Sequence, residues 1–422
     1  MRSIYLSLFL VLAWSSRGAA GVLRLDLDDV IHPISAEYVA QGIAQAESEQ
    51  AVAVIMRLST PGGLDPSMRQ IIEKILASKV PVIVFVGPSG VRAASAGFFI
   101  LMAADLAVMA PGTNTGAAHP VSIGGAKSDE VMAKKIENDA AAYLRSFTAK
   151  RGRNATVAEK GVTESRSFTE TEALKEGLID GIASDVDAIV EQFHGKTIHR
   201  FDGTSVTLKL KGEGIRTVAM SLRQRVLAKA LNPNIALMLG LIGLMGLYIE
   251  FTHPGLILPG VVGGLCLFIA LVALNILPVN VLGVVFIIAA LVLFVLEAKV
   301  TSYGALAALG VAAMVFGSLI LIDSPLPELR VRLGTAIAMA LPFAAITVFL
   351  MRLVILAHRH KSVTGEEGLM TETGIALTPI DGEGRVRLHG EIWQASSETP
   401  ISAGEQVKVL AVDGMKVRVG RM

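Results

Sequence analysis

The feature that most constrains the fold of this chain is a run of five long apolar segments in its C-terminal half. They lie at 234–251, 255–277, 279–297, 302–322 and 333–357. Each is long enough to cross a bilayer. The whole chain is 52% hydrophobic and only 18% charged, whereas soluble domains are roughly one quarter charged. We therefore expect a multi-pass membrane protein with soluble ends and a transmembrane region at 233–358.

The topology of this region follows from its charges. Five crossings put the two soluble ends on opposite sides of the membrane. Arg352, Arg359 and Lys361 at the last exit favour a cytoplasmic C-terminus. Basic residues before the first crossing favour the opposite orientation. We give them less weight, because the preference for basic residues on the cytoplasmic side does not hold for long translocated domains. The expected location is the cell (inner) membrane. Segment 234–251 is the shortest, so a re-entrant loop is the alternative to a span there.

The N-terminus has the pattern of a secretory signal. Arg2 precedes an apolar run at 4–14, and Gly18-Ala19-Ala20 follows. This predicts a signal peptide at 1–20 that is cleaved after Ala20. An uncleaved anchor helix is the alternative, although the run is short for a span. In either case the next domain is exported.

Residues 21–195 read as an exported α/β domain. Continuous apolar strands at 51–58, 80–86 and 106–109 alternate with predicted helices, of which the long one covers 127–151. Such strands are typical of a sheet that is covered on both faces. Residues 196–232 form a junction, with a hairpin at 197–210 and an amphipathic helix at 215–231. That helix suits a membrane surface, and a packed linker helix is the equal alternative.

The tail, 365–422, has five short strand-like runs separated by turns, which predict a small all-β barrel of the OB type. OB barrels often bind single-stranded nucleic acid through a basic groove and aromatic platforms. From Lys361 onward, seven Lys/Arg against nine Asp/Glu give a net charge of −2, and Trp393 is the only aromatic residue. The formal charge of the whole chain is only +1, which also argues against a nucleic-acid partner. We expect the tail to contact protein.

Ser95 is the candidate nucleophile of the α/β domain. It follows a buried strand and opens a short apolar helix, in the sequence Arg92-Ala-Ala-Ser-Ala-Gly97. Its hydroxyl is then beside the positive helix end, with the Ala96 N–H pointing toward the same space. One N–H of Gly62 and Gly63 could complete an oxyanion hole with Ala96, and Gly63 is slightly favoured because it lies one step further from the strand end. Taken alone, such a serine is more often a helix cap, and Pro-Gly-Gly is more often a plain turn.

Lys135 is the candidate general base. Helix phase places it at the border of an apolar face, whereas Lys134 points roughly opposite. A desolvated lysine loses its proton more easily and can serve as a base. Asp139 lies one turn further on, so an ordinary i,i+4 ion pair is the competing interpretation. That pair would keep the amine charged.

His119 is the alternative base, and Asp65 or Asp105 could orient it. Spacing alone does not decide between His119 and Lys135. The sequence has no metal-binding spacing of glutamate and histidine and no glycine-rich phosphate loop. We therefore expect neither a cofactor nor a metal.

These motifs resemble those of the long form of the NfeD family, also called stomatin operon partner proteins, which are membrane-bound serine peptidases of the ClpP/crotonase superfamily. The resemblance covers nearly the whole mature chain. Segment 92–97 matches the nucleophile motif, with Ser95 on its serine, and 135–139 falls on the catalytic lysine segment. Segments 109–120, 232–235 and 250–255 and the tail are also similar.

The resemblance implies a ClpP/crotonase-like fold, a Ser95–Lys135 dyad, no cofactor and oligomers. It also implies hydrophobic stretches of membrane-associated proteins as substrates, with stomatin-like (SPFH) proteins as partner or substrate. The apolar residues that flank the serine motif favour an apolar cleft as well, namely Phe98, Phe99, Val121 and Ile123. The alternative function is a non-enzymatic membrane scaffold that organises stomatin-like assemblies.

Overall fold

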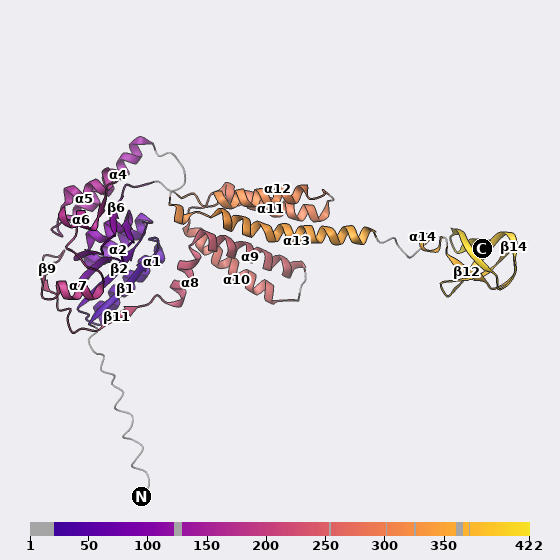
Figure 1. Ribbon diagram of the computed structural model, residues 1–422, viewed down its shortest axis with the longest axis horizontal. Coiled ribbons are helices and arrows are strands. Elements are labelled where there is room, and N and C mark those ends of the chain that lie inside the picture. Colours follow the sequence, from indigo (N-terminus) through magenta and orange to yellow (C-terminus); the bar gives the residue numbers. More distant parts are fainter. Residues whose placement is uncertain are drawn as a thin grey trace, which may run out of the picture. The chain divides into compact units, whose positions relative to one another are not determined.

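The computed structural model (Figure 1) describes residues 21–121, 129–252, 255–300, 302–324, 326–359, 366–370 and 372–422. The predicted signal peptide at 1–20 lies outside the described residues. The chain divides into two compact units. One is Met1–Val292 with Leu309–Leu341, and the other is Leu293–Ala308 with Pro342–Met422.

A six-stranded parallel sheet forms the centre of the N-terminal domain, in the order β11-β1-β2-β3-β5-β8. Its strands are β1 (Val22–Asp28), β2 (Ala53–Ser59), β3 (Val82–Val86), β5 (Leu106–Met109), β8 (Gly181–Ile182) and β11 (Ile215–Val218). Because the strands are parallel, all of them end at the same edge of the sheet. The Thr60-Pro-Gly-Gly63 turn follows β2 and therefore lies at that edge.

Both faces of this sheet are covered, because successive strand residues point to opposite sides. Leu25, Met56 and Val84 pack in one core with α1 (Pro33–Ser48), α2 (Asp65–Ala77) and α3 (Ala96–Ala103). Ile55 and Ile83 pack in a second core with α7 (Val186–Phe193) and with the antiparallel hairpin of β9 (Thr197–His199) and β10 (Ser205–Thr207). The sheet covered on both faces and the hairpin are present as predicted, but the hairpin and β11 pack into this domain, which therefore extends past the predicted end at residue 195.

A smaller sheet positions the candidate nucleophile. It consists of β4 (Arg92–Ala94), β6 (Asn114–Gly116) and β7 (Ser167–Thr169), in that order. Around it lie α4 (Glu130–Thr148), α5 (Ala155–Thr163) and α6 (Glu170–Lys175). The start of α4 is later than the predicted residue 127, since Asp129 caps the helix by accepting from the Val131 N–H. Ser95 occupies the step from β4 to α3.

The predicted helix at 215–231 is wrong in its first part. Residues Ile215–Val218 form β11, which pairs in parallel with β1 at the edge of the main sheet. The β-branched residues of that segment suit a strand. The helix is α8 (Leu222–Ala230), which begins at a capping box of Ser221 and Gln224. Gln224 is buried and donates to Gln41 of α1 at 3.0 Å, whereas Leu222 is exposed.

Five apolar helices follow at the expected places. They are α9 (Pro233–Thr252), α10 (Leu258–Ile276), α11 (Val281–Lys299), α12 (Ala305–Ile320) and α13 (Leu333–Arg359). Among the described residues, three stretches are long and apolar enough to cross a membrane, namely Pro233–Phe251, Leu258–Ile276 and Pro327–Ile346. Val281–Glu297 and Ala305–Ile320 are shorter, so the predicted count of five spans is not confirmed. The short 3-10 helix η1 (Pro327–Leu329) precedes α13.

The tail forms a closed five-stranded barrel, as predicted. Its order is β12-β13-β14-β16-β15, and β15 pairs with β12 to close it. The strands are β12 (Thr373–Ala376), β13 (Ile380–Leu388), β14 (Glu391–Ile401), β15 (Gln406–Asp413) and β16 (Lys416–Arg421), after a short α14 (Glu366–Leu369). Val386, Val407 and Val417 are among its fully buried core residues.

Candidate active site

Ser95 has a strained backbone, and its hydroxyl does not cap the helix that follows. Its φ is +52° and its ψ is −115°, a region in which a non-glycine residue costs about 1–3 kcal/mol. The Ser95 N–H donates to the Gly116 carbonyl at 2.9 Å and so ties the residue to β6. Although Ser95 precedes α3, its side chain makes no capping hydrogen bond. The helix-cap alternative therefore does not account for the hydroxyl.

The Gly62–Gly63 turn passes directly beside Ser95. A Cβ on Gly62 would lie 2.8 Å from the Ser95 Cβ, so a side chain there has no room. A Cβ on Gly63 would lie 2.1 Å from the Ile31 carbonyl oxygen. The turn is fixed by Ile31, whose N–H donates to the Gly62 carbonyl and whose carbonyl accepts from the Leu64 N–H, both at 2.8 Å. Both glycines are thus required by close approach.

The two glycine N–H groups differ in what they bind. The Gly62 N–H donates to the Thr60 hydroxyl at 3.1 Å. Within the described ranges, no protein group accepts a hydrogen bond from the N–H of Gly63 or from that of Ala96, the first residue of α3. Of the two glycine N–H groups, that of Gly63 is therefore the better candidate to bind an oxyanion.

One cavity of about 590 Å³ brings most of the predicted residues together. Gly63, Ser95, Ala96 and Lys135 all line it. Its apolar lining includes Phe99, Val121, Ile136, Leu326 and Leu329. Gly62 and His119 are not among the lining residues. A hydroxyl, an amine and two backbone donors thus surround one space, which is the set of groups that acyl transfer requires.

Lys135 does not form the competing i,i+4 ion pair. Asp139 instead accepts from the Arg69 guanidinium at 2.6 Å, and Lys134 pairs with Glu137 at 2.7 Å. No ion pair of Lys135 is found in the part of the chain that the structure describes. Burial opposes the charge of Arg69, but its hydrogen bonds to Asp139 and Asp65 outweigh that effect and raise its pKa. Arg69 therefore remains a charged partner for Asp139.

The desolvation that was expected for Lys135 is absent from this single chain. Lys135 is exposed, as are Val131 and Met132 on the same end of α4. Deeper along the helix, Tyr143 lies beneath the Arg69 guanidinium, 4.3 Å from its ring centroid, and burial raises the pKa of its phenol. The apolar cover of α4 thus begins beyond Lys135.

His119 is turned away from the cavity. Its Nδ1 lies 3.0 Å from the Val162 carbonyl oxygen of α5. Asp65 pairs with Arg69, and Asp105 is buried between Arg151 and Arg200. Among the described contacts, neither carboxylate orients His119. The same residues contain no group of His, Cys, Asp and Glu that could hold a metal ion.

Of the four expected wall residues, Phe99 and Val121 line the cavity and Phe98 does not. Phe98 is fully buried and stacks on Phe168 at 6.2 Å, because its side chain points into the core rather than into the cavity. Ile123 lies outside the described residues. Missed wall residues from the segment between α12 and α13 are Ser324, Leu326 and Leu329. No local pattern marks them, because the connection at 321–332 mixes apolar residues with charged ones throughout.

Comparison with known families assigns a domain to each part of the chain. Residues 22–199 match the NfeD1b N-terminal domain. Residues 234–353 match the NfeD integral membrane domain. Residues 366–421 match the NfeD-like C-terminal, partner-binding domain. The chain is therefore a membrane protein, in agreement with its apolar helices.

Similar solved structures cover about half of the chain. A serine-to-alanine mutant of the 1510-N membrane-bound stomatin-specific protease is 34% identical, with a TM-score of 0.45, and covers 48% of this chain and 98% of its own. A lysine-to-alanine mutant of the same protease, in complex with a substrate peptide, is 32% identical, with a TM-score of 0.47, and covers 50% of this chain and 96% of its own.

Two relatives span nearly the whole chain. Membrane protein NfeD1b of Bacillus subtilis is 27% identical over 409 residues, which is 91% of this chain and 89% of the relative. Membrane-bound protease PH1510 of Pyrococcus horikoshii is 33% identical over 393 residues, which is 90% of this chain and 88% of the relative. With all three domains matched in order, the chain belongs to the NfeD family.

Proposed function

We propose that this chain is a membrane-bound serine endopeptidase in which Ser95 is the nucleophile and Lys135 the general base. The observation that carries the proposal is the strained backbone of Ser95, at a cavity that Ser95 shares with Lys135. Strain of this kind clusters at functional sites. The similarity to a protein named a membrane-bound protease supports the same reaction class.

The acylation step uses four groups of the cavity. Neutral Lys135 Nζ takes the proton of the Ser95 hydroxyl while Oγ attacks the carbonyl carbon of the scissile peptide bond. The carbonyl oxygen becomes an oxyanion, and the N–H groups of Gly63 and Ala96 donate to it. The tetrahedral intermediate then collapses. The C–N bond breaks, Lys135 returns its proton to the leaving amine, and an ester joins Ser95 to the acyl half of the substrate.

Deacylation repeats these steps with water. Lys135 removes a proton from a water molecule as its oxygen attacks the ester carbonyl, and the same two N–H groups hold the second oxyanion. The ester C–O bond breaks and Oγ takes the proton back. The enzyme is restored and a carboxylic acid leaves. No redox step or cofactor is needed for this balance.

Because Lys135 is exposed in the free chain, the bound substrate has to help remove the charge of its amine. A charged amine cannot accept the serine proton, and an amine loses its charge more readily when apolar groups replace water around it. Val121, Ile136 and Leu326 line the cavity near Lys135. We infer that a bound apolar segment fills this space and excludes water from the amine, so that the base is assembled on binding.

The proposed substrate is an apolar stretch of a membrane-associated protein of the stomatin-like (SPFH) class. The family resemblance points to that class, and the apolar lining of the cavity favours apolar side chains. The proposed orientation has the peptidase domain exported and the barrel in the cytoplasm after five crossings. From the resemblance to ClpP-like proteins, we also propose that the chain assembles into a homo-oligomer.

A scaffold is the second candidate function. The tail matches a domain described as partner-binding, so the membrane region and the barrel can organise stomatin-like proteins without cleaving them. A chain that retains its biological role with Ser95 replaced would favour the scaffold. Loss of that role would favour the enzyme.

The test of the peptidase is turnover of an apolar peptide by the full-length chain in detergent. Ser95→Ala should lower kcat by about 10³-fold or more, as the loss of a nucleophile does. Ser146→Ala is the matched control, because Ser146 is exposed on α4 and, among the described residues, its hydroxyl donates only to the Tyr143 carbonyl. Full turnover by Ser95→Ala would refute the assignment of the nucleophile.

A further inference from the structure

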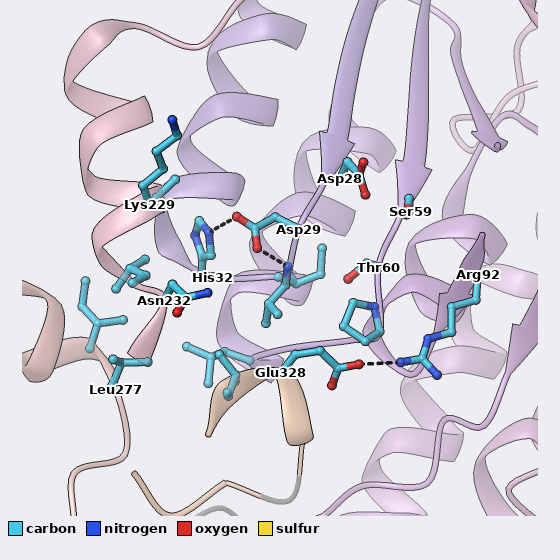
Figure 2. A pocket seen from close by; sticks show the side chains of 18 of the residues that line it. Asp28, Asp29, His32, Ser59, Thr60, Arg92, Lys229, Asn232, Leu277 and Glu328 are labelled. Carbon is cyan, nitrogen blue, oxygen red and sulfur yellow. Dashed lines mark hydrogen bonds and ion pairs between the residues drawn. The ribbon is translucent and has the colours of Figure 1, made fainter. Parts of the chain in front are cut away.

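The segment that joins α12 to α13 contacts the peptidase domain. We call residues 326–332, which contain η1, the connector. Glu328 of the connector accepts a hydrogen bond from Arg92 of β4 at 2.8 Å, across 236 positions of sequence, and Figure 2 shows this pair. Leu329 is only 9% exposed although it lies in a short connection. The connector, which belongs to the membrane region, therefore packs against the surface of the peptidase domain.

The connector is held in place from both ends. The Asn234 side chain, at the start of α9, accepts from the Arg332 N–H at 2.9 Å and donates to the Arg330 carbonyl at 3.4 Å. Arg330 Nε donates to the Ser324 carbonyl at 2.6 Å, and Val331 is 5% exposed. These bonds make the connector a fixed wall rather than a loose loop.

Two connector leucines face the catalytic cavity. Leu326 and Leu329 line the cavity of about 590 Å³ that also holds Ser95 and Lys135. Leu329 and Leu64 also line a second cavity of about 640 Å³. Figure 2 shows this second cavity, with Arg92, Glu328 and Lys229 around it. The two cavities thus adjoin at Leu64 and Leu329.

We propose that Leu326 and Leu329 are specificity-determining residues, through which the membrane region selects an apolar side chain next to the scissile bond. The proposal rests on the peptidase function proposed above. The ligand is an extended polypeptide segment with an aliphatic or aromatic residue beside the bond that Ser95 attacks. The selection is built into the same chain that holds the enzyme at the bilayer, so apolar segments at the membrane surface are favoured over soluble loops.

The kinetic test uses the full-length chain in detergent and two peptides that differ only by Leu or Lys beside the scissile bond. Leu326→Glu should lower the preference for Leu over Lys, expressed as a ratio of kcat/KM, by about 10-fold or more, since apolar pocket contacts discriminate by about that factor each. Leu333→Ala is the matched control, because Leu333 is 54% exposed at the start of α13 and lines neither cavity. It should keep the wild-type ratio.

A second measurement needs no turnover. The photo-reactive residue p-benzoylphenylalanine replaces Leu326 in the Ser95→Ala chain, which is then illuminated with the Leu peptide. A crosslink at position 326, and none when the probe replaces Leu333, supports the inference. A wild-type selectivity ratio in Leu326→Glu together with no crosslink overturns it. Full turnover by Ser95→Ala would instead refute the proposed function, and the crosslink would still decide whether Leu326 contacts the peptide.

Discussion

Replacement of Lys135 should lower catalytic activity without changing the stability of the fold. Lys135→Met keeps much of the length and apolar stem of the side chain but removes the amine. Lys135 is exposed and forms no ion pair among the described residues. The loss of an exposed lysine without a partner should change the free energy of unfolding by less than about 0.5 kcal/mol. Any large loss of activity then comes from the missing base.

The expected magnitude follows from the function of a general base. Its removal lowers the rate about 10²- to 10⁴-fold, which is about 2.7–5.5 kcal/mol of transition-state stabilisation. The neighbouring change Lys134→Met is the matched control. Lys134 pairs with Glu137 at the surface, with 64% of its side chain exposed, and such pairs contribute about 0–1 kcal/mol to stability. Its rate should stay within about 2-fold of wild type.

The assay is steady-state cleavage of an apolar peptide by the full-length chain in detergent, with His119→Ala as a third variant. We expect kcat to fall in Lys135→Met alone. Loss of kcat in Lys134→Met, with Lys135→Met unaffected, would move the base by one residue. Loss only in His119→Ala would give the function to histidine, against the contact of its ring with the Val162 carbonyl.

Four other predictions follow from the structure. Asp105→Asn should destabilise the chain by about 3–5 kcal/mol in thermal unfolding, because it leaves the buried guanidinium of Arg151 without its counter-charge; a change below about 1 kcal/mol would contradict this. Gly62→Ala should lower kcat about 10²-fold by displacing the Ser95 side chain, whereas Gly112→Ala, which also has a positive φ but open space around it, should not. Protease protection in oriented vesicles should find the peptidase domain and the barrel on opposite sides, and finding them on the same side would mean an even number of crossings. The purified chain should show no salt-dependent affinity for single-stranded DNA or RNA, and submicromolar binding near physiological salt would mean that the barrel serves the commoner use of its fold.

The regular elements of this fold were largely predictable from local patterns. Continuous apolar runs such as those of β2 and β3 indicate strands of a sheet that is covered on both faces. In the tail, turns separate five short strands, and a chain segment of that length can pair these strands only with one another to form a closed barrel. The segment Ile215–Val218 was missed because helical periodicity continued across it by chance. Its conformation is decided by pairing with β1, almost 200 positions away, and no local pattern reports such a contact.

Sequence patterns brought most of the candidate residues to one cavity but did not predict what surrounds them. The order of strand, serine and helix placed Ser95, and the glycine pair placed Gly62 and Gly63 at the same edge. The sequence favoured Gly63 only by its distance from the strand end, and the Thr60 hydroxyl, which accepts from the Gly62 N–H, is a reason that the sequence did not supply. The contribution of Leu326 depends on how the membrane region meets the peptidase domain. Both depend on tertiary contacts, which cannot be predicted from the spacing of residues in the sequence.

The most direct test of the central claim is the site of covalent labelling by a peptidyl phosphonate, a reagent that phosphonylates activated serines. The full-length chain is labelled in detergent, digested and sequenced by tandem mass spectrometry. We expect one labelled residue, Ser95, with labelling slowed about 10²-fold or more in Lys135→Met, as for the loss of a base. Labelling at another residue, or equal labelling of Ser95 with and without Lys135, would contradict the proposed dyad.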